Sequence, residues 1–469
     1  MTIKLIFCIV NIYNNKHGRH KKVTLKTSKY NFFFTAPDGA ELLFNSTTTG
    51  FAKLDPDSTH IVKEMLASPN DYECDTEIKK DIKQKLISGR FLINSQENEL
   101  LRLKISNRTG KFNNQSLGLT IAPTLSCNFR CTYCFEDPKK QKMTPTVEKA
   151  IVELVEKRVN SIDKLSITWF GGEPLLALDV MERLTKELRK ICKKYKCDYT
   201  AGIITNGYLW DRKTALKCKR LGVKSAQITL DGPPDVHDKR RLTVNKKGTF
   251  DRILKNIEKT YDILPISIRV NTDKDNADRV SEIVDIFITK GLHNKTKLYF
   301  AKVEAYTETC ANISGSCHNC QEYSALEVEL CRNAQSKGFI TSRYPRPFGS
   351  GYCGAEGISA LVVSPSGLVF KCWNQISGKE NEAVGDLVRK DLKLPEFDLN
   401  LQKWLGWDIF EKTECLDCKI LPICMGGCPY NAMKESDKNR GHCQAWKYNL
   451  IDMLQLKYQM MCSAPQKGG

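Results

Sequence analysis

Apolar and polar positions in the middle of the chain alternate in a way that predicts strands followed by helices. Short apolar runs, which are typical of buried strands, lie at 117–121, 165–170, 199–204, 225–230, 266–271 and 297–303. Segments with apolar residues at helical spacing lie between them, near 145–161, 180–195, 211–221, 248–262 and 277–290. Because strands that alternate with helices run parallel, the pattern implies a partial barrel or an open α/β sheet. Of the two, we predict an α/β fold with a partial (β/α)6 barrel of TIM type.

The first hundred residues follow a different pattern. Two strand-like runs that begin at Tyr30 and Ala40 flank a turn at Pro37-Asp-Gly, which predicts a hairpin. Two helix-like stretches, 57–67 and 76–88, and a further short strand come next. We therefore predict a small α+β domain of winged-helix type. The edge of its hairpin is able to bind a peptide by strand addition, and the alternative is a cap that packs on the barrel.

Composition narrows the class of protein. The hydrophobic fraction, 41%, is ordinary for a globular domain, and the net charge is +18. This charge fits an acidic partner or a solvated lysine surface, but no RNA-binding signature supports a nucleic-acid partner. No apolar run is long enough to span a membrane, and the short run at 5–10 lacks a cleavage site. We expect a cytoplasmic protein with reduced cysteines and no membrane partner.

Three of the 20 cysteines, Cys127, Cys131 and Cys134, follow the first predicted barrel strand on a loop. Thiolates at these spacings are able to converge on one soft metal centre, and cysteine is the usual ligand of an iron–sulfur cluster. A cubane has four irons, so three thiolates leave one iron for a ligand that is not protein. Zinc sites instead favour C-x2–4-C pairs with a distant second pair.

A second group of cysteines lies beyond the barrel, in the pattern C-x13-G-x4-C, C-x2-C-x5-C-x3-C, C. Its members are Cys353, Cys372, Cys415, Cys418, Cys424, Cys428 and Cys443. A strand pair around 361–364 and 368–371 is expected to hold Cys372, and the glycines before Cys428 allow tight turns. A zinc ribbon is the alternative for the four cysteines from Cys415 to Cys428, but it leaves the other three unexplained.

The loop C-x3-C-x-Tyr-C after a first strand resembles the cluster loop of the radical S-adenosylmethionine (SAM) superfamily, in which SAM binds the fourth iron. The motifs at the next strand ends agree, since active sites of such folds gather there. The resemblance implies that Glu173 receives the amino group of SAM and that Arg269 pairs with its carboxylate. The residues it assigns to SAM are Tyr133, Gly171, Gly172, Glu173, Pro174, Asn206, Asp231, Arg269 and Asn271.

The later cysteines match the SPASM extension of radical SAM enzymes that modify peptides and proteins. The resemblance implies two auxiliary [4Fe-4S] clusters, one held by Cys353, Cys372 and Cys428 and the other by Cys415, Cys418, Cys424 and Cys443. Relatives carry a further cysteine shortly after the first, which this chain lacks. The first auxiliary cluster therefore either has an open iron that binds a substrate thiolate or takes a ligand from Cys310, Cys317 or Cys320.

The stretch from His237 to Arg241 resembles one found in the peptide-modifying branch, and the N-terminal domain resembles a leader-peptide recognition element. Together they imply a maturase that makes a 5′-deoxyadenosyl radical and installs a crosslink, which we expect to be a Cys thioether, in a Cys-rich ribosomal precursor peptide. A low-potential donor such as ferredoxin or flavodoxin would supply electrons. Sulfatase-maturing relatives carry an aspartate base where this chain has Trp373, which favours crosslinking. No catalytic side chain is assigned.

Three alternatives stay open: an anaerobic sulfatase-maturase type of enzyme, a nucleic-acid-modifying iron–sulfur protein, and a non-catalytic metal-binding scaffold. For the favoured interpretation we predict four parts. They are an N-terminal recognition domain at 1–110, the radical SAM barrel at 111–305, a linker at 306–350 and the SPASM extension at 351–469.

Overall fold

The computed structural model describes residues 3–7, 24–339, 343–348, 353–389, 391–392, 398–435 and 441–463, with 3–7 and 391–392 as backbone only. Contacts divide these residues into two compact units. The larger unit contains the described parts of Phe112–Ser342 and Cys353–Trp407, and the smaller one those of Met1–Lys111, Arg343–Tyr352 and Asp408–Gly469. The predicted ranges 1–110, 111–305, 306–350 and 351–469 stay predictions about independent domains.

The larger unit is built on one sheet, which has ten strands among the described residues, in the order β14-β13-β11-β10-β9-β7-β15-β16-β17-β18. Its parallel barrel strands are β7 (Ser116–Ile121), β9 (Lys164–Trp169), β10 (Asp198–Thr205), β11 (Val223–Thr229), β13 (Ile266–Thr272) and β14 (Lys297–Lys302). The six predicted strands are confirmed, and so is the partial barrel. Strands β7 and β9 bury alternate residues, so their apolar faces meet the core.

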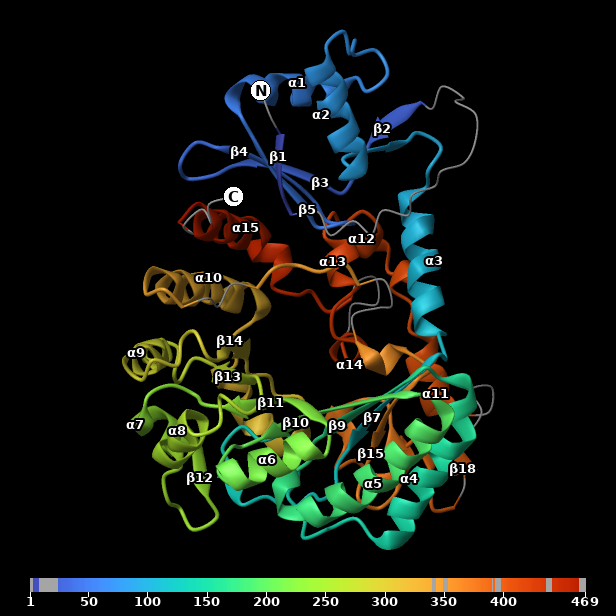
Figure 1. The fold of residues 1–469 in the computed structure, drawn as a ribbon, viewed down its shortest axis with the longest axis vertical. Helices are drawn as coiled ribbons and strands as arrows, with labels where there is room; N and C mark the ends of the chain where they lie inside the picture. Colours follow the sequence, from blue (N-terminus) through green and yellow to red (C-terminus); the bar gives the residue numbers. More distant parts are fainter. Residues whose placement is uncertain are drawn as a thin grey trace. The chain divides into compact units, whose positions relative to one another are not determined.

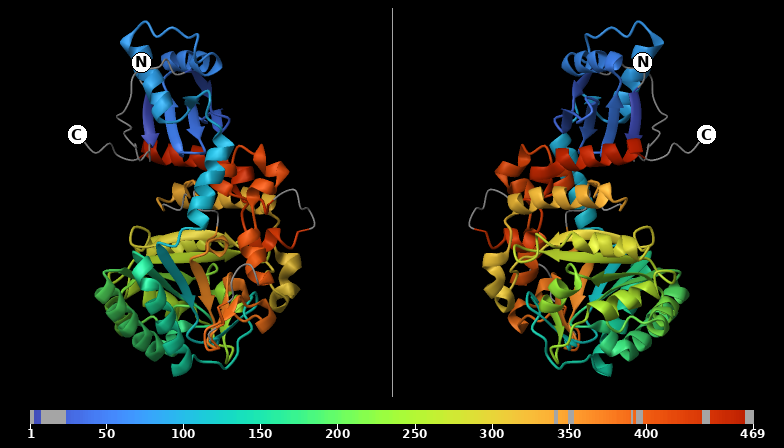
Figure 2. Two further views of the ribbon diagram at one scale, coloured as in Figure 1. Left: turned by 90° about the vertical axis from the view of Figure 1, so that its right-hand side faces the viewer. Right: turned by 90° about the vertical axis from the view of Figure 1, so that its left-hand side faces the viewer.

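Helices connect these strands and cover the outer face of the sheet (Figures 1 and 2). They are α4 (Pro145–Arg158), α5 (Leu178–Tyr195), α6 (Arg212–Arg220), α7 (Pro234–Arg240), α8 (Phe250–Glu258) and α9 (Glu282–Thr289). Local signals set their starts: Thr144 caps α4 before Pro145, and Asp211 caps α6. The five predicted helices are confirmed, and α7 was not predicted as a separate helix.

The predicted strand pair near Cys372 is confirmed, but it is part of the barrel sheet. Strand β15 (Ala360–Val363) runs parallel to β7, and β16 (Leu368–Phe370) returns beside it. The amide of Ala122 donates to the carbonyl of Val363 at 3.0 Å. Strands β17 (Gly385–Asp386) and β18 (Asp391–Leu392) extend the sheet further. The start of the cysteine-rich region therefore covers what would otherwise be the open edge of β7.

The smaller unit contains the predicted N-terminal hairpin, formed by β3 (Asn31–Thr35) and β4 (Glu41–Asn45). The predicted helices are confirmed as α1 (Pro56–Ala67) and α2 (Glu77–Ser88). Further elements were not predicted or only partly so: β1 (Ile3–Phe7), β2 (Leu25–Thr27), β5 (Gly50–Leu54), β6 (Leu92–Asn94) and α3 (Glu99–Lys111). The sheet order is β1-β5-β4-β3, and Leu43, Val62 and Leu86 pack in its core.

C-terminal segments complete the smaller unit. Helix α15 (Trp446–Ser463) contacts the hairpin, since Gln455 Nε2 donates to the carbonyl of Thr35 at 2.9 Å and the Tyr458 hydroxyl bonds Asp38 at 2.8 Å. The hydroxyl of Ser46 donates to the carbonyl of Lys419 at 2.6 Å. The N-terminal hairpin and the C-terminal cysteine loop therefore belong to one packed body.

Five further α-helices, one of 17 residues and four of four to eight residues, lie in the described part of the chain. They are α10 (Cys320–Ser336) and α11 (Leu399–Gly406) in the larger unit, and α12 (Thr413–Leu416), α13 (Leu421–Cys424) and α14 (Pro429–Ala432) in the smaller one. None of the described helices has the length and apolar character needed to cross a membrane.

The pairing of β15 with β7 predicts the effect of a core substitution. Val363 is 0% exposed and Val388, beyond β17, is 40% exposed. We expect Val363→Ala to lower the free energy of unfolding by about 2 kcal/mol, because two buried methyl groups and their packing are lost. Val388→Ala is the matched control and should change it by less than about 0.5 kcal/mol.

Urea unfolding measures both variants, and amide hydrogen exchange reports where the sheet opens. Faster exchange in β7 of Val363→Ala is the expected result. Unchanged exchange in β7 would contradict the joint sheet.

Candidate functional site

A cavity of about 250 Å³ lies in the larger unit, where the carboxyl ends of the barrel strands meet the loop after β7. Most of the residues assigned from the sequence line it: Cys127, Cys131, Tyr133, Cys134, Gly171, Gly172, Asn206, Arg269 and Asn271. Three others, Glu173, Pro174 and Asp231, are buried but are not part of the lining. The strand-end motifs are therefore brought together, and their contacts with SAM stay predictions.

A short antiparallel ribbon holds the cysteine loop in place. Strand β8 (Phe129–Cys131) pairs with β12 (Arg241–Thr243), so Cys131 lies opposite Arg241. The amide of Thr132 donates to the carbonyl of Arg240 at 3.0 Å. Neither strand was predicted, because each has only three residues and its pairing is distant in sequence.

Gly171 and Gly172 allow the end of β9 to pass close to the cysteine loop. Gly171 has a φ of +100°, and a Cβ there would lie 2.6 Å from the carbonyl oxygen of Thr124. A Cβ on Gly172 would lie 2.5 Å from that of Ser126. Larger residues at either position would push the two loops apart. The glycines are therefore required by contact between two loops, in addition to any ligand.

Glu173 joins the ends of β9 and β10. Its carboxylate accepts hydrogen bonds from the amide of Leu175 at 3.0 Å, the amide of Asn206 at 2.7 Å and the hydroxyl of Thr205 at 2.8 Å. Burial raises the pKa of Glu173 to about 6, although these donors oppose the shift. Both of its oxygens are thus already occupied by protein donors.

The hydroxyl of Tyr133 connects the cysteine loop to three other segments. It accepts hydrogen bonds from Arg241 Nη1 at 2.6 Å and Asn271 Nδ2 at 3.0 Å, and it donates to Asp231 Oδ2. Asp231 also accepts the amide of Asn271 at 3.1 Å. Burial raises the pKa of Tyr133, so the hydroxyl keeps its proton. Tyr133 and Asp231 therefore fix the shape of the site.

The stretch from His237 to Arg241 supports this network. His237 Nδ1 accepts the amide of Asp231 at 3.1 Å, and burial lowers the pKa of the imidazole, so the ring stays neutral. Arg240 forms a two-pronged ion pair with Asp273 at 2.9 and 2.7 Å. Of the five residues in this stretch, Arg241 is the one that lines the cavity.

Aromatic rings form another wall of the cavity. Phe135 stacks on Phe170 with ring centroids 6.4 Å apart, and Tyr306 meets Phe135 edge-on at 6.1 Å. Trp373 packs on Phe170 at 5.5 Å and is 44% exposed, so this wall reaches the surface. These rings follow different strands, and only Trp373 had been singled out in the sequence.

Charged residues that the sequence analysis missed also line the cavity. Lys302 Nζ pairs with Glu304 at 2.6 Å. Glu136 is buried, and burial together with the charge of Glu173 raises its pKa to about 8. The position of Glu136, two residues after Cys134, was the one signal in the sequence that could have identified it.

The three thiols fit an iron–sulfur cluster. Burial raises the pKa of Cys127 to about 12 and also raises those of Cys131 and Cys134, so a positively charged partner is needed to hold them as thiolates. Among the residues that the structure describes, no three Cys, His, Asp or Glu side chains meet closely enough for a single metal ion. A cluster takes each sulfur on a different iron, farther apart than around one zinc.

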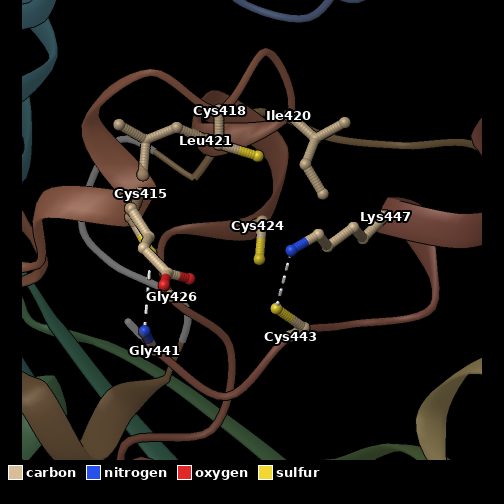
Figure 3. A pocket seen from close by; sticks show the side chains of 10 residues that line it. Cys415, Cys418, Ile420, Leu421, Cys424, Gly426, Gly441, Cys443 and Lys447 are labelled. Atoms are coloured by element: carbon tan, nitrogen blue, oxygen red, sulfur yellow. Dashed lines mark hydrogen bonds between the residues drawn. The ribbon is translucent and has the colours of Figure 1, made fainter. Parts of the chain in front are cut away.

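In the smaller unit, Cys415, Cys418, Cys424 and Cys443 line one pocket of about 30 Å³ (Figure 3). The amide of Gly441 donates to Cys415 Sγ at 3.4 Å, and Lys447 Nζ donates to Cys443 Sγ at 3.6 Å. The four cysteines assigned together from the resemblance thus face one space. A lysine and an amide beside the sulfurs suit a negatively charged cluster.

The other auxiliary set is divided between the units. Cys353 and Cys372 flank the β15–β16 hairpin in the larger unit, whereas Cys428 lies in the smaller one. Cys310 is buried and its thiol bonds the carbonyl of Thr307 at 3.4 Å, and Cys317 bonds that of Ile313 at 3.4 Å. The shared cluster of Cys353, Cys372 and Cys428, and its fourth ligand, stay predictions.

Comparison with known proteins agrees with these features. The model of the Radical SAM superfamily matches residues 121–287. The cysteine-type anaerobic sulfatase-maturating enzyme of Clostridium novyi is 33% identical over 352 residues, which cover 68% of this chain and 89% of that enzyme.

Solved structures share the fold. The structure of anSMEcpe with bound AdoMet has a TM-score of 0.60 at 20% identity, over 73% of this chain and all of that one. The structure of Streptococcus suis SuiB bound to the precursor peptide SuiA has a TM-score of 0.53 at 17% identity, over 90% of this chain and 99% of that one. The chain thus belongs to the radical SAM superfamily, as an enzyme related to the cysteine-type anaerobic sulfatase-maturating enzymes.

Proposed function

We propose that this enzyme is a peptide maturase that installs a crosslink, a Cys thioether, in a Cys-rich ribosomal precursor peptide. The observation that carries the proposal is the open aromatic wall of the cavity. Trp373 lines the cavity and is also exposed, so a peptide side chain is able to reach the three thiols from the surface. Two similar structures contain a bound peptide, Cp18Cys in anSMEcpe and the precursor peptide SuiA in SuiB.

In this proposal Cys127, Cys131 and Cys134 hold a [4Fe-4S] cluster with SAM on the fourth iron. When the cluster is bound and reduced, the cluster and SAM together would supply the 5′-deoxyadenosyl radical that removes hydrogen from the peptide. Arg269 Nε bonds Asn271 Oδ1 at 2.8 Å, and no acidic side chain of the described residues lies within ion-pair distance of its guanidinium. Arg269 is thus oriented and available for the SAM carboxylate.

The remaining cavity residues position ligands and exclude water. Asn206 donates from Nδ2 to Asn128 at 2.8 Å, which orients its amide beside the cysteine loop. The rings of Phe135, Phe170 and Tyr306 make one side of the cavity apolar, which protects a radical from solvent.

The auxiliary cysteines are proposed to hold two further [4Fe-4S] clusters. The pocket of Cys415, Cys418, Cys424 and Cys443 supports one of them, and Lys447 would stabilise its negative charge. Clusters held there would supply a site for the electron released when the crosslink closes, and a ferredoxin or flavodoxin is the proposed donor to the SAM site.

The N-terminal hairpin is the proposed binding site for the leader of the precursor. Strand β3 lies at the end of its sheet, so strand addition by a peptide is possible along its outer edge. The contact between Ser46 and Lys419 joins this hairpin to the loop of Cys415 and Cys418. Peptide recognition and one auxiliary cluster would then share a single body.

A second candidate is formylglycine formation of the sulfatase-maturase type. The 33% identity with the Clostridium novyi enzyme favours it. Trp373 opposes it, because an indole stands where those relatives are expected to carry an aspartate base.

A nucleic-acid substrate is supported by one observation only, the net charge of +18, and salt-sensitive RNA binding is its test.

Loss of one cluster thiolate predicts loss of SAM cleavage. We expect Cys131→Ala, prepared without oxygen and given a strong reductant, to form no 5′-deoxyadenosine, because the cluster lacks a ligand. Cys462→Ala removes an exposed cysteine of α15 and should match the wild type. Chromatography measures the nucleoside, and iron and sulfide analysis shows whether one cluster equivalent per chain is lost. Cleavage at the wild-type rate by Cys131→Ala would rule out the assigned site.

A search for a small cysteine-rich peptide encoded beside this gene, followed by co-expression with any peptide found, tests the product. Each crosslink should lower the peptide mass by two hydrogens, and a thioether should also remove one thiol from alkylation. Formylglycine would instead replace a thiol with an aldehyde that reacts with hydrazide. Mass spectrometry separates these outcomes, and the Cys131→Ala enzyme is the negative control.

Removal of the Tyr133 hydroxyl should loosen the cysteine loop. We expect Tyr133→Phe to lower the free energy of unfolding by about 1–3 kcal/mol, because Arg241, Asn271 and Asp231 each lose a buried partner. Iron retention at the SAM site should fall with it.

Tyr261→Phe is the matched control, since Tyr261 is only partly buried and lies outside the network. Denaturant titration and iron analysis measure both variants. Equal stability and iron content in Tyr133→Phe and the wild type would show that the hydroxyl does not hold the loop.

A further inference from the structure

One carboxyl oxygen in the cavity wall has no hydrogen-bond partner among the described residues. Glu136 lines the cavity and is 6% exposed, and its Oε2 atom makes no hydrogen bond to any residue that the structure describes. Buried polar atoms are nearly always hydrogen-bonded, and an unsatisfied one costs free energy. A bound molecule that donates an N–H or O–H group to Glu136 would remove this cost.

Glu173, another buried carboxyl group near the cavity, differs from Glu136 in its hydrogen-bond partners. The two carboxyl groups are close enough to influence each other electrostatically, but Glu173 accepts three protein donors and does not line the cavity. Its oxygens have little capacity left for a ligand. Glu136 is the one of the two that faces the space where a ligand binds.

The neighbours of Glu136 indicate which ligand it meets. Its backbone amide bonds the thiol of Cys134, so it lies directly beside the proposed cluster. Phe135 next to it stacks on Phe170, and Thr307 Oγ1 bonds the carbonyl of Phe135 at 2.9 Å, which holds this segment in place. Flat apolar rings next to a hydrogen-bond acceptor suit a planar base that carries N–H groups. SAM has such a group in its adenosine.

We propose that Glu136 is a positioning residue for SAM, whose carboxyl accepts a hydrogen bond from an N–H or O–H group of the adenosine. The proposal depends on the proposed function in one respect, that SAM binds on the cluster of Cys127, Cys131 and Cys134. It adds a contact that the motif resemblance did not assign, since the resemblance gives Glu173 the amino group of SAM and gives Glu136 no role.

The test compares SAM binding to unreduced, cluster-loaded enzyme by equilibrium dialysis. Glu136→Met keeps the length of the side chain but removes the acceptor, so the Kd for SAM should rise roughly tenfold. Glu136→Gln keeps an acceptor oxygen and should stay within about threefold of the wild type. Asp137→Asn is the control, because Asp137 is exposed and pairs with Lys139 on the surface.

Two further measurements separate positioning from a structural role. Iron content should be unchanged in Glu136→Met, and its thermal midpoint should be equal to or above that of the wild type, because a buried unsatisfied group is removed. A structural residue would instead lose stability.

A wild-type Kd in Glu136→Met, at full iron content, would overturn the proposal. A fall of iron content in both Glu136 variants would also overturn it, since the residue would then support the cluster. Failure of iron-loaded wild-type enzyme to bind SAM would count against the proposed function itself.

Discussion

The buried hydroxyl of Tyr133 is the contact on which the site depends. It lies on the cysteine loop. Its partners are Asp231 after β11, Arg241 in β12 and Asn271 near the end of β13. Because the three partners of Tyr133 are buried, they depend on its hydroxyl for hydrogen bonds that water cannot readily replace. Three thiols on an irregular loop are thus held with the rigidity of the sheet, which a loop of that length does not have on its own.

Much of this arrangement was predictable, because its signals are local. Apolar periodicity predicted the six barrel strands, and cysteine spacing predicted that Cys127, Cys131 and Cys134 face one space. The family resemblance, and not spacing alone, grouped Cys415, Cys418, Cys424 and Cys443, which line one pocket. The rule that sites form at the carboxyl ends of parallel strands then brought Asn206, Arg269 and Asn271 to the same cavity.

What could not be predicted depends on contacts between distant parts of the chain. Gly171 and Gly172 were expected to approach a ligand, and the structure adds a second constraint that was not predicted, the close backbone of Thr124 and Ser126. Glu173 was expected to bind the amino group of SAM, and its hydrogen bonds with Thr205 and Asn206 could not be predicted, because they join the ends of two neighbouring strands. The pairing of β15 with β7 joins segments about 240 residues apart, and neither strand carries a local sign of its partner.

The joint body formed by the N-terminal hairpin and the C-terminal cysteine loop has a consequence for how such enzymes diversify. Ser46 and Lys419 are 373 positions apart, yet they share a hydrogen bond in the same compact unit. Exchange of the first hundred residues between relatives would break the surface against which the later cysteines pack. New specificities would therefore arise by paired changes at both ends of the gene, and the two termini would be inherited as one module.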